Sequence, residues 1–168
     1  MNAHQLASLI AQSITGHADY ATKPSKAIRK WDGKTPYGIH PVWCAMTVLT
    51  ETSLPEDLRV RIAQALLFQD FLEDTTAKLP DMLTDGVREL VDEMTFESSA
   101  VEMQEVWSRS AEAKLAKVYD KTSNLLDGSW MTQEKRAQYA DYLLRLCEVV
   151  EKAYGPLNII TIARAIAA

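Results

Sequence analysis

Apolar side chains recur through most of this chain at intervals of three and four residues, the period that gathers them on one face of an α-helix. Leu6, Ile10 and Ile14 form one such series, which stops at Gly16. No segment shows the strict alternation of apolar and polar residues that is typical of a half-buried strand. The pattern predicts helices over residues 2–15, 40–51, 53–72, 84–94, 111–126, 132–154 and 157–167. We therefore expect an all-α bundle.

Turn-forming residues separate the expected helices. Residues 17–39 are polar and contain several Pro and Gly residues, so they predict a loop with at most one helical turn. The DGS turn at 127–129 and the GP pair at 155–156 end two later helices. The chain has no internal repeat or long linker, and its 168 residues are enough to bury one core. We expect residues 1–168 to form a single domain.

The composition narrows the classes of function. Lys and Arg number 18 against 23 Asp and Glu, a net charge of −5, so the chain lacks the positive field that binds nucleic-acid polymers. No apolar run approaches the roughly 20 residues of a membrane span, and the segment MNAHQLASLIAQSI lacks the basic and apolar regions of a signal peptide. We expect a cytoplasmic protein without a membrane partner, in which Cys44 and Cys147 are buried thiols. Association into a homo-oligomer stays open.

The segment ALLFQDFLEDT at 65–75 places polar side chains within an apolar run. Gln69, Asp70, Glu73 and Asp74 stand at i, i+1, i+4 and i+5, close to one stripe of a helix. Such a stripe faces either water or a cation. Metal sites draw imidazole and carboxylate ligands from different helices. Three candidate residues, His40, Asp70 and Asp120, lie on three different expected helices.

Three segments occur in the order RKWDGKTPYGIHP, ALLFQDFLEDT and AKLAKVYDKTSNL. Together they resemble the motifs of the HD superfamily of metal-dependent phosphohydrolases, in the branch that holds the hydrolase domains of Rel/SpoT enzymes and their small stand-alone metazoan homologue. The resemblance covers roughly residues 17–165. It implies a single-domain HD-type helical bundle, a nucleotide substrate and a divalent metal ion as cofactor, with Mn²⁺, Co²⁺, Zn²⁺ and Mg²⁺ as the candidates.

The resemblance also implies roles for individual residues. The implied metal ligands are His40, Gln69, Asp70 and Asp120. The acidic pair of Glu73 and Asp74 matches residues that position or activate the attacking water. The implied contacts to the phosphates or the sugar of the substrate are Arg29, Lys30, Lys34, Lys117, Lys121 and Asn124.

The chain departs from this family at the second metal ligand, where the family has His and this sequence has Gln69. An amide oxygen binds hard cations, but it binds Zn²⁺, Fe²⁺ or Co²⁺ far more weakly than imidazole does. Three accounts stay open: a natural variant that uses Mn²⁺ or Mg²⁺, an engineered substitution that traps substrate, and a nucleotide-binding protein that has lost turnover. Because the acidic pair, Arg29 and Asn124 persist, complete loss of function is the least favoured account.

Two classes of substrate remain candidates. Rel-type ppGpp hydrolases carry a basic segment between the acidic pair and the last aspartate, whereas residues 93–110 here read EMTFESSAVEMQEVWSRS and contain only Arg109 as a basic residue. The stretch DKTSNLLDGSW resembles the short deoxynucleoside triphosphatases of bacteria and their phages. We therefore expect a deoxynucleoside triphosphate triphosphohydrolase, with dATP as the assumed substrate, and keep a (p)ppGpp 3′-pyrophosphohydrolase as the alternative.

Overall fold

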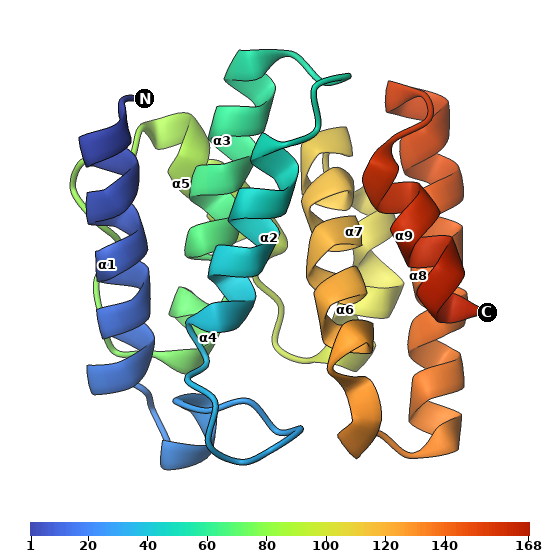
Figure 1. Cartoon of the computed structure of the whole chain (residues 1–168), viewed down its shortest axis with the longest axis horizontal. Coiled ribbons are helices and arrows are strands. Elements are labelled where there is room, and N and C mark those ends of the chain that lie inside the picture. The colour runs from blue at the N-terminus through green and yellow to red at the C-terminus, as the bar shows by residue number, and fades with distance from the viewer.

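The computed structural model describes residues 1–168, which form α-helices and connecting segments without a β-strand (Figure 1). The helices, in chain order, are α1 (Ala3–Asp19), α2 (Ile39–Leu49), α3 (Glu56–Leu67), α4 (Phe71–Asp74), α5 (Asp85–Met94), α6 (Ser99–Glu105), α7 (Ala111–Leu126), α8 (Gln133–Tyr154) and α9 (Asn158–Ala167). Three short 3₁₀ turns lie between them, η1 (Pro24–Lys26), η2 (Val106–Ser108) and η3 (Gly128–Trp130). The predicted all-α bundle is confirmed.

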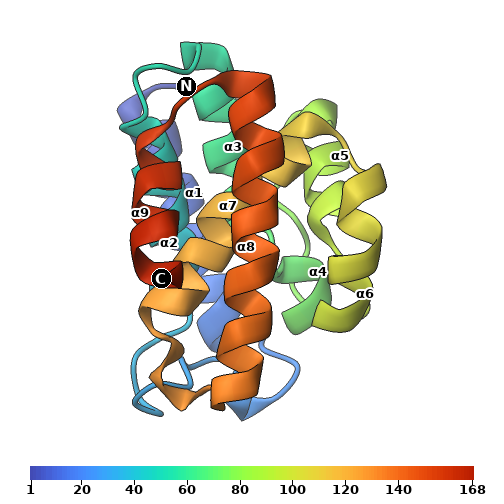
Figure 2. The same cartoon turned by 90° about the vertical axis from the view of Figure 1, so that its right-hand side faces the viewer.

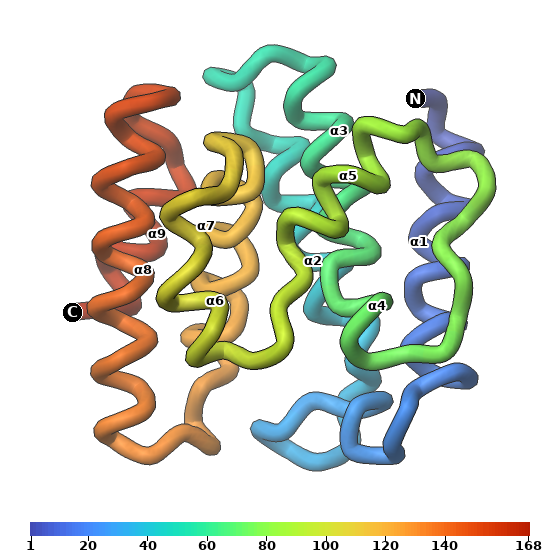
Figure 3. The backbone as a smooth tube through the Cα atoms, turned by 180° about the vertical axis from the view of Figure 1, so that it is seen from behind, coloured from blue at the N-terminus to red at the C-terminus, as the bar shows by residue number.

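Helix α7 lies at the centre of the bundle. It packs against α2, α3 and α5 on one side and against α8 and α9 on the other, while α1 covers the far edge (Figure 1). Seen from behind, α5 and α6 lie in front of α3 and α7 (Figure 3), and the side view places both on that same face (Figure 2). None of the helices combines the length and the apolar composition that a membrane-spanning segment requires.

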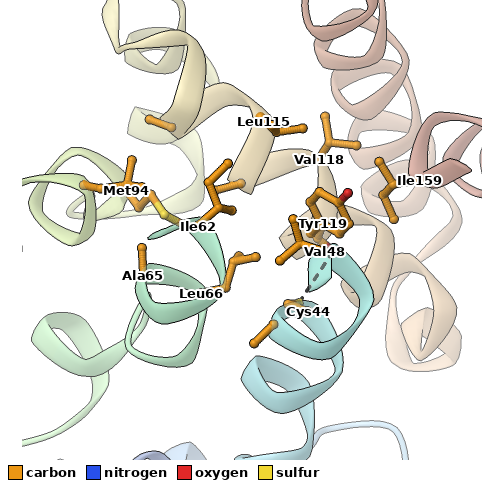
Figure 4. Packing of buried hydrophobic residues seen from close by; sticks show 14 of the residues in the cluster. Cys44, Val48, Ile62, Ala65, Leu66, Met94, Leu115, Val118, Tyr119 and Ile159 are labelled. Carbon is orange, nitrogen blue, oxygen red and sulfur yellow. Dashed lines mark hydrogen bonds between the residues drawn. The ribbon is translucent and has the colours of Figure 1, made fainter. Parts of the chain in front are cut away.

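The hydrophobic core joins these helices in one cluster of 36 buried residues. Its centre lies where α2, α3 and α7 meet, with Val48, Leu66 and Tyr119 in close packing (Figure 4). Met94 of α5 and Ile159 of α9 extend the cluster on either side (Figure 4). Helix α7 is buried along most of its length, so its polar residues are held in fixed positions.

The first helix is longer than the sequence predicts. It continues past Gly16 to Asp19, because Gly16 is a point of close packing rather than a helix end. A Cβ at Gly16 would lie 2.1 Å from Cζ of Phe71, so only glycine allows the ring of Phe71 to approach the backbone of α1. The predicted stop at Gly16 is therefore wrong.

The predicted helix 53–72 is interrupted. Helix α3 ends at Leu67, and residues 68–70 turn the chain before α4 begins at Phe71. The carbonyl of Leu67 accepts a hydrogen bond of 2.6 Å from the buried Ser13 hydroxyl of α1, and the amide of Phe71 donates instead to the carbonyl of Phe68. This break places Gln69 and Asp70 at a helix junction, where side chains can turn inward, instead of on a continuous helical stripe.

Two further segments differ from their sequence patterns. Residues 99–105 form α6, which the pattern did not predict, and Ser98 caps its start by accepting a hydrogen bond from the amide of Val101. Two isolated backbone bridges involve the predicted loop, Ala21 with Thr75 and Ile28 with Pro36. The first holds the start of the loop against the end of α4, and the second pairs two parts of the loop with each other.

Candidate active site

A cavity of about 280 Å³ opens where residues 25–37 meet α4, α6, the second half of α7 and the start of α8. The loop that contains residues 25–37 and the start of α8 lie at the lower end of the bundle in Figures 1 and 2. Six acidic side chains line the cavity: Asp70, Glu73, Asp74, Glu97, Glu102 and Asp120. Six basic side chains line it as well: Lys26, Arg29, Lys30, Lys117, Lys121 and Lys135. Opposite charges therefore meet within one small polar space.

His40, near the start of α2, is 2% exposed and does not itself line the cavity, but it contacts Asp70 and Asp120, which do. Its Nε2 lies 3.2 Å from Oδ1 of Asp120 and 3.7 Å from Oδ2 of Asp70. The same nitrogen lies 2.9 Å from Nε2 of Gln69, while Nδ1 lies 2.8 Å from the hydroxyl of Ser123. The structure thus brings together the four side chains that the sequence resemblance implies as metal ligands.

The fit of these residues to a metal ion depends on Gln69. Donors that share one ion through bonds of about 2.1 Å lie roughly 3 Å apart. No group of three or more His, Cys, Asp and Glu side chains in this structure is arranged to hold a metal in that way. A further donor is therefore needed, and Oε1 of Gln69 is buried without a hydrogen-bond partner. A half-turn of the amide exchanges Oε1 with Nε2 and presents the oxygen to His40. Two carboxylates, an amide oxygen and one imidazole fit a hard cation such as Mn²⁺ or Mg²⁺.

Asp120 is buried in the middle of α7 beside two buried ammonium groups. Its Oδ2 lies 3.1 Å from Nζ of Lys121 and 3.4 Å from Nζ of Lys117. Burial opposes the charged form, but Lys121 and Lys117 hold the pKa of Asp120 well below its ordinary value. Burial likewise opposes the lysines' charge, yet Asp120 and the neighbouring Glu102 raise the pKa of both above the ordinary value. Asp120, Lys117 and Lys121 therefore stay charged at neutral pH.

Arg29 is buried, but its guanidinium is already engaged within the protein. Nε and Nη2 donate to the two carboxylate oxygens of Asp127 at 2.6 and 2.9 Å, and Nη2 also donates to Oδ1 of Asn124 at 3.0 Å. Asn124 in turn donates from Nδ2 to Oδ1 of Asp120 at 2.7 Å. The geometry therefore favours Arg29 as a support for Asn124 and Asp120 over the expected direct contact to a phosphate.

The acidic pair lies at the cavity with one partner on each carboxylate. Oε1 of Glu73 accepts a hydrogen bond of 2.9 Å from the amide of Phe96. Although Glu73 keeps an exposed surface, desolvation in the cavity and the charge of Asp70 raise its pKa to about 7. Asp74 is 5% exposed and forms an ion pair with Lys26, and its burial raises its pKa despite that pair. Glu73 can thus gain or lose a proton near neutral pH.

The predicted lysine contacts divide into two groups. Lys30, Lys117 and Lys121 line the cavity, whereas Lys34 is exposed outside it, because Asp32 holds the loop through the backbone amide of Lys34. Nζ of Lys30 lies 4.5 Å from the ring centre of Trp130, and Nζ of Lys135 lies 4.9 Å from the same ring. Neither of these two ammonium groups takes part in an ion pair. The cavity therefore keeps positive charge that no carboxylate neutralises directly.

Several residues that line the cavity are not among the site residues predicted from the sequence. Tyr37 donates from its hydroxyl to Oδ2 of Asp70 at 2.8 Å, and its place in the segment PYGIHP is a signal that could have identified it. Lys135 lies in no motif, and Trp130 ends the stretch DKTSNLLDGSW without being a predicted site residue; the turn between α7 and α8 brings both to the cavity. Glu102 stands in the segment whose periodicity predicts no element.

The fold and the cavity define an all-α protein with a compact, charge-lined polar site. No protein-family model matches the chain, and no curated protein matches it. Among solved structures, the chain is similar to a metazoan orthologue of SpoT, described as hydrolysing ppGpp and playing a role in starvation responses. The two share 21% sequence identity and superpose with a TM-score of 0.71 over 99% of this chain and 95% of the other. This match establishes a shared fold.

Proposed function

We propose that the protein is a nucleotide phosphohydrolase that acts in this cavity. The observation that carries the proposal is the contact of buried His40 with Asp70 and Asp120, two carboxylates that line a cavity whose other walls bear cationic side chains. Hydrolysis of a phosphate ester or anhydride uses carboxylates around a water and fixed cations around the transferred group. The fold shared with a protein that hydrolyses ppGpp supports this choice.

The metal ligands in this proposal are His40, Gln69, Asp70 and Asp120. A divalent cation bound there would supply an acidified water and a polarised phosphoryl oxygen. The residues behind the ligands fix their orientation: Ser123 holds Nδ1 of His40, Tyr37 holds Asp70, and Asn124 holds Asp120. Such supporting hydrogen bonds set the tautomer and direction of metal ligands.

Other side chains accept the proton of the attacking water and stabilise the charge of the transferred phosphoryl group. Glu73, whose pKa is raised to about 7, accepts a proton from the attacking water near neutral pH. Lys117 and Lys121 are buried ammonium groups that face the cavity, and they donate to the oxygens of the transferred group. Asp74 keeps Lys26 at the rim, and its backbone carbonyl accepts hydrogen bonds from Thr22, which holds the loop closed over α4.

The substrate that the cavity supports best carries more than one phosphate group. Lys30 and Lys135 lie around Trp130 without a carboxylate partner, so a second phosphate group would neutralise them. This observation favours ppGpp, which bears phosphates on both sides of its ribose. The acidic residues Glu97 and Glu102 at the cavity favour the second candidate, a deoxynucleoside triphosphate with a single phosphate chain, because they reduce the positive charge available.

A turnover screen tests the proposal. The purified protein is incubated with ppGpp, each dNTP and each NTP, with Mn²⁺, Co²⁺, Zn²⁺ and Mg²⁺ in turn, and the released phosphate or pyrophosphate is measured. We expect metal-stimulated hydrolysis that Asp70→Asn and Asp120→Asn abolish. Nucleotide binding without turnover under every metal would instead identify a protein that has lost catalysis.

A matched control uses helix α7 itself. Lys114 stands one turn before Lys117, donates to the carbonyl of Arg109 at 2.6 Å and does not line the cavity. Lys114→Ala should keep parental kcat and KM, whereas Lys117→Ala should raise KM and lower kcat. Equal effects of the two substitutions would mean that the cavity is not where the substrate binds.

A further inference from the structure

Glu102 of α6 connects the two buried lysines of α7 to helix α8. The residue is buried, with 5% of its surface exposed. Oε2 accepts hydrogen bonds from Nζ of Lys121 at 2.8 Å and from Nζ of Lys117 at 3.3 Å. Oε1 accepts one from the hydroxyl of Tyr142 at 3.0 Å, which fixes the carboxylate from the other side.

The same two lysines also face Asp120, so each ammonium group lies between two carboxylates. Nζ of Lys121 is 2.8 Å from Glu102 and 3.1 Å from Asp120, and Nζ of Lys117 is 3.3 and 3.4 Å from them. An ammonium group has three N–H donors. Lys117 donates to both carboxylates, whereas Lys121 donates to Glu102 and lies within ion-pair distance of Asp120, so each lysine keeps at least one free N–H. The remaining neighbours are the ring faces of Phe96 and Tyr139, which attract a cation weakly compared with a phosphoryl oxygen.

The charges of this group cancel. Glu102 and Asp120 contribute two negative charges, and Lys117 and Lys121 contribute two positive ones. A neutral group attracts an anion less strongly than two free lysines would, but it presents donors in fixed directions. Loss of the Glu102 charge should therefore have two separable effects, stronger attraction of an anion and poorer orientation of the donors.

We propose that Glu102 is a positioning residue that holds Lys117 and Lys121 so that one N–H of each is directed to a phosphoryl oxygen of the ligand. That the ligand is phosphorylated rests on the proposed function, whereas the charge balance of Glu102, Asp120 and the two lysines does not. Because Glu102 acts through the two lysines, its removal should change binding and turnover in opposite directions, which a merely structural residue would not do.

Pyrophosphate binding measured by calorimetry in metal-free buffer tests the charge balance without turnover. Glu102→Gln removes the charge while its amide oxygen still accepts, so pyrophosphate should bind roughly tenfold more tightly than to the parent. Glu102→Asp keeps the charge but withdraws the carboxylate by about one C–C bond length, about 1.5 Å, so pyrophosphate should bind about threefold more weakly. An unchanged Kd in Glu102→Asp, or no measurable binding to any of the three proteins, would overturn the proposal. If Glu102→Gln folds, an equal Kd of pyrophosphate for this variant and for the parent would also overturn the proposal.

Turnover then distinguishes this proposal from the proposed function. With the best substrate, Glu102→Gln should lower kcat about tenfold and also lower KM, because a charge-assisted hydrogen bond is lost while attraction grows. Glu51→Gln is the matched control, since Glu51 is equally buried but caps α9 through the amides of Asn158 and Ile159. It should lower the melting temperature and leave kcat, KM and pyrophosphate binding alone. If the parent hydrolyses no nucleotide but the binding order holds, the function is wrong and the role of Glu102 stands.

Discussion

His40 and Gln69 contact each other inside the bundle, with Nε2 of the imidazole 2.9 Å from Nε2 of the amide. In the tautomer of His40 that carries its proton on Nδ1, the amide N–H donates to Nε2 and occupies the lone pair with which His40 would bind a metal ion. At the same time, Oε1 of Gln69 is buried without a partner. A metal ion would relieve both conditions by turning the amide, so Gln69 makes metal binding conditional on one side-chain rotation.

Restoring an imidazole at this position should raise metal affinity. Gln69→His supplies a second nitrogen ligand, and we expect Mn²⁺ or Zn²⁺ to bind tens-fold more tightly, by analogy with the 10–100-fold cost of losing residues that support a metal site. Titration calorimetry of metal binding is the measurement. Gln64→His, on the half-buried part of α3 outside the cavity, is the control and should leave the affinity unchanged. If both variants bind the metal equally, His40, Asp70 and Asp120 do not form its site.

Arg29 should contribute to stability more than to ligand binding. Arg29→Ala leaves the carboxylate of Asp127 and the amide oxygen of Asn124 without their donor, so we expect a loss of about 3 kcal/mol in the free energy of unfolding. Arg29→Lys should recover little, because an ammonium group cannot form the bidentate pair. Urea denaturation and pyrophosphate calorimetry on the same samples provide the measurement. An Arg29→Ala protein that keeps its stability but binds pyrophosphate far more weakly would instead support a direct contact between Arg29 and a phosphate group.

The sequence predicts most helices because their apolar spacing continues into the packed core, as along α7 and α8. It does not predict the break at residues 68–70, because Phe68 and Phe71 keep an apolar pattern that suits a helix. The break depends on Ser13, which takes the carbonyl of Leu67 from 54 residues away in the chain. Tertiary contacts of this kind override local propensity.

The candidate site likewise has residues that the sequence predicts and residues that it does not. His40, Asp70 and Asp120 stand in sequence motifs, and the structure brings them within hydrogen-bonding or ion-pair distance. Glu102 could not be found from sequence, because its short helix has no periodic pattern and its partners lie on α7 and α8. Arg29 shows the opposite case, in which a motif residue is present but its partner Asp127 changes what it can contact.

Turnover should rise with pH as Glu73 loses its proton. Its pKa is raised to about 7 from an ordinary 4.5, so in the folded protein Glu73 is protonated at pH 6 and becomes able to accept a proton only above neutrality. We expect kcat of the parent to increase through pH 7 and kcat of Glu73→Gln to be low and independent of pH over that range. A pH profile of Glu73→Gln that rises like that of the parent would assign the base elsewhere.

The same shift affects stability with a defined sign. Between pH 4.5 and about 7 the folded state keeps a proton on Glu73 that the unfolded chain releases, so this group lowers the stability as pH rises through that window. Glu73→Gln should remove this part of the decrease, as measured by urea denaturation at pH 5 and pH 8. Because Glu73 keeps an exposed surface, solvent screening reduces the effect, and turnover is the more sensitive measurement.

The approach of Phe71 to Gly16 should connect the packing of α1 with the site. A Cβ at Gly16 would overlap the ring of Phe71, so Gly16→Ala must displace that ring, and we expect a loss of about 2 kcal/mol despite the better helix propensity of Ala. Gly86→Ala is the matched control in α5, since a Cβ there meets nothing within 4 Å and should leave stability equal or higher. Because Phe71 follows Asp70 directly, Gly16→Ala should also weaken Mn²⁺ binding in the folded protein. Melting temperature and metal titration on both variants test this, and a Gly16→Ala protein as stable as Gly86→Ala would show that α1 tolerates a wider spacing from α4.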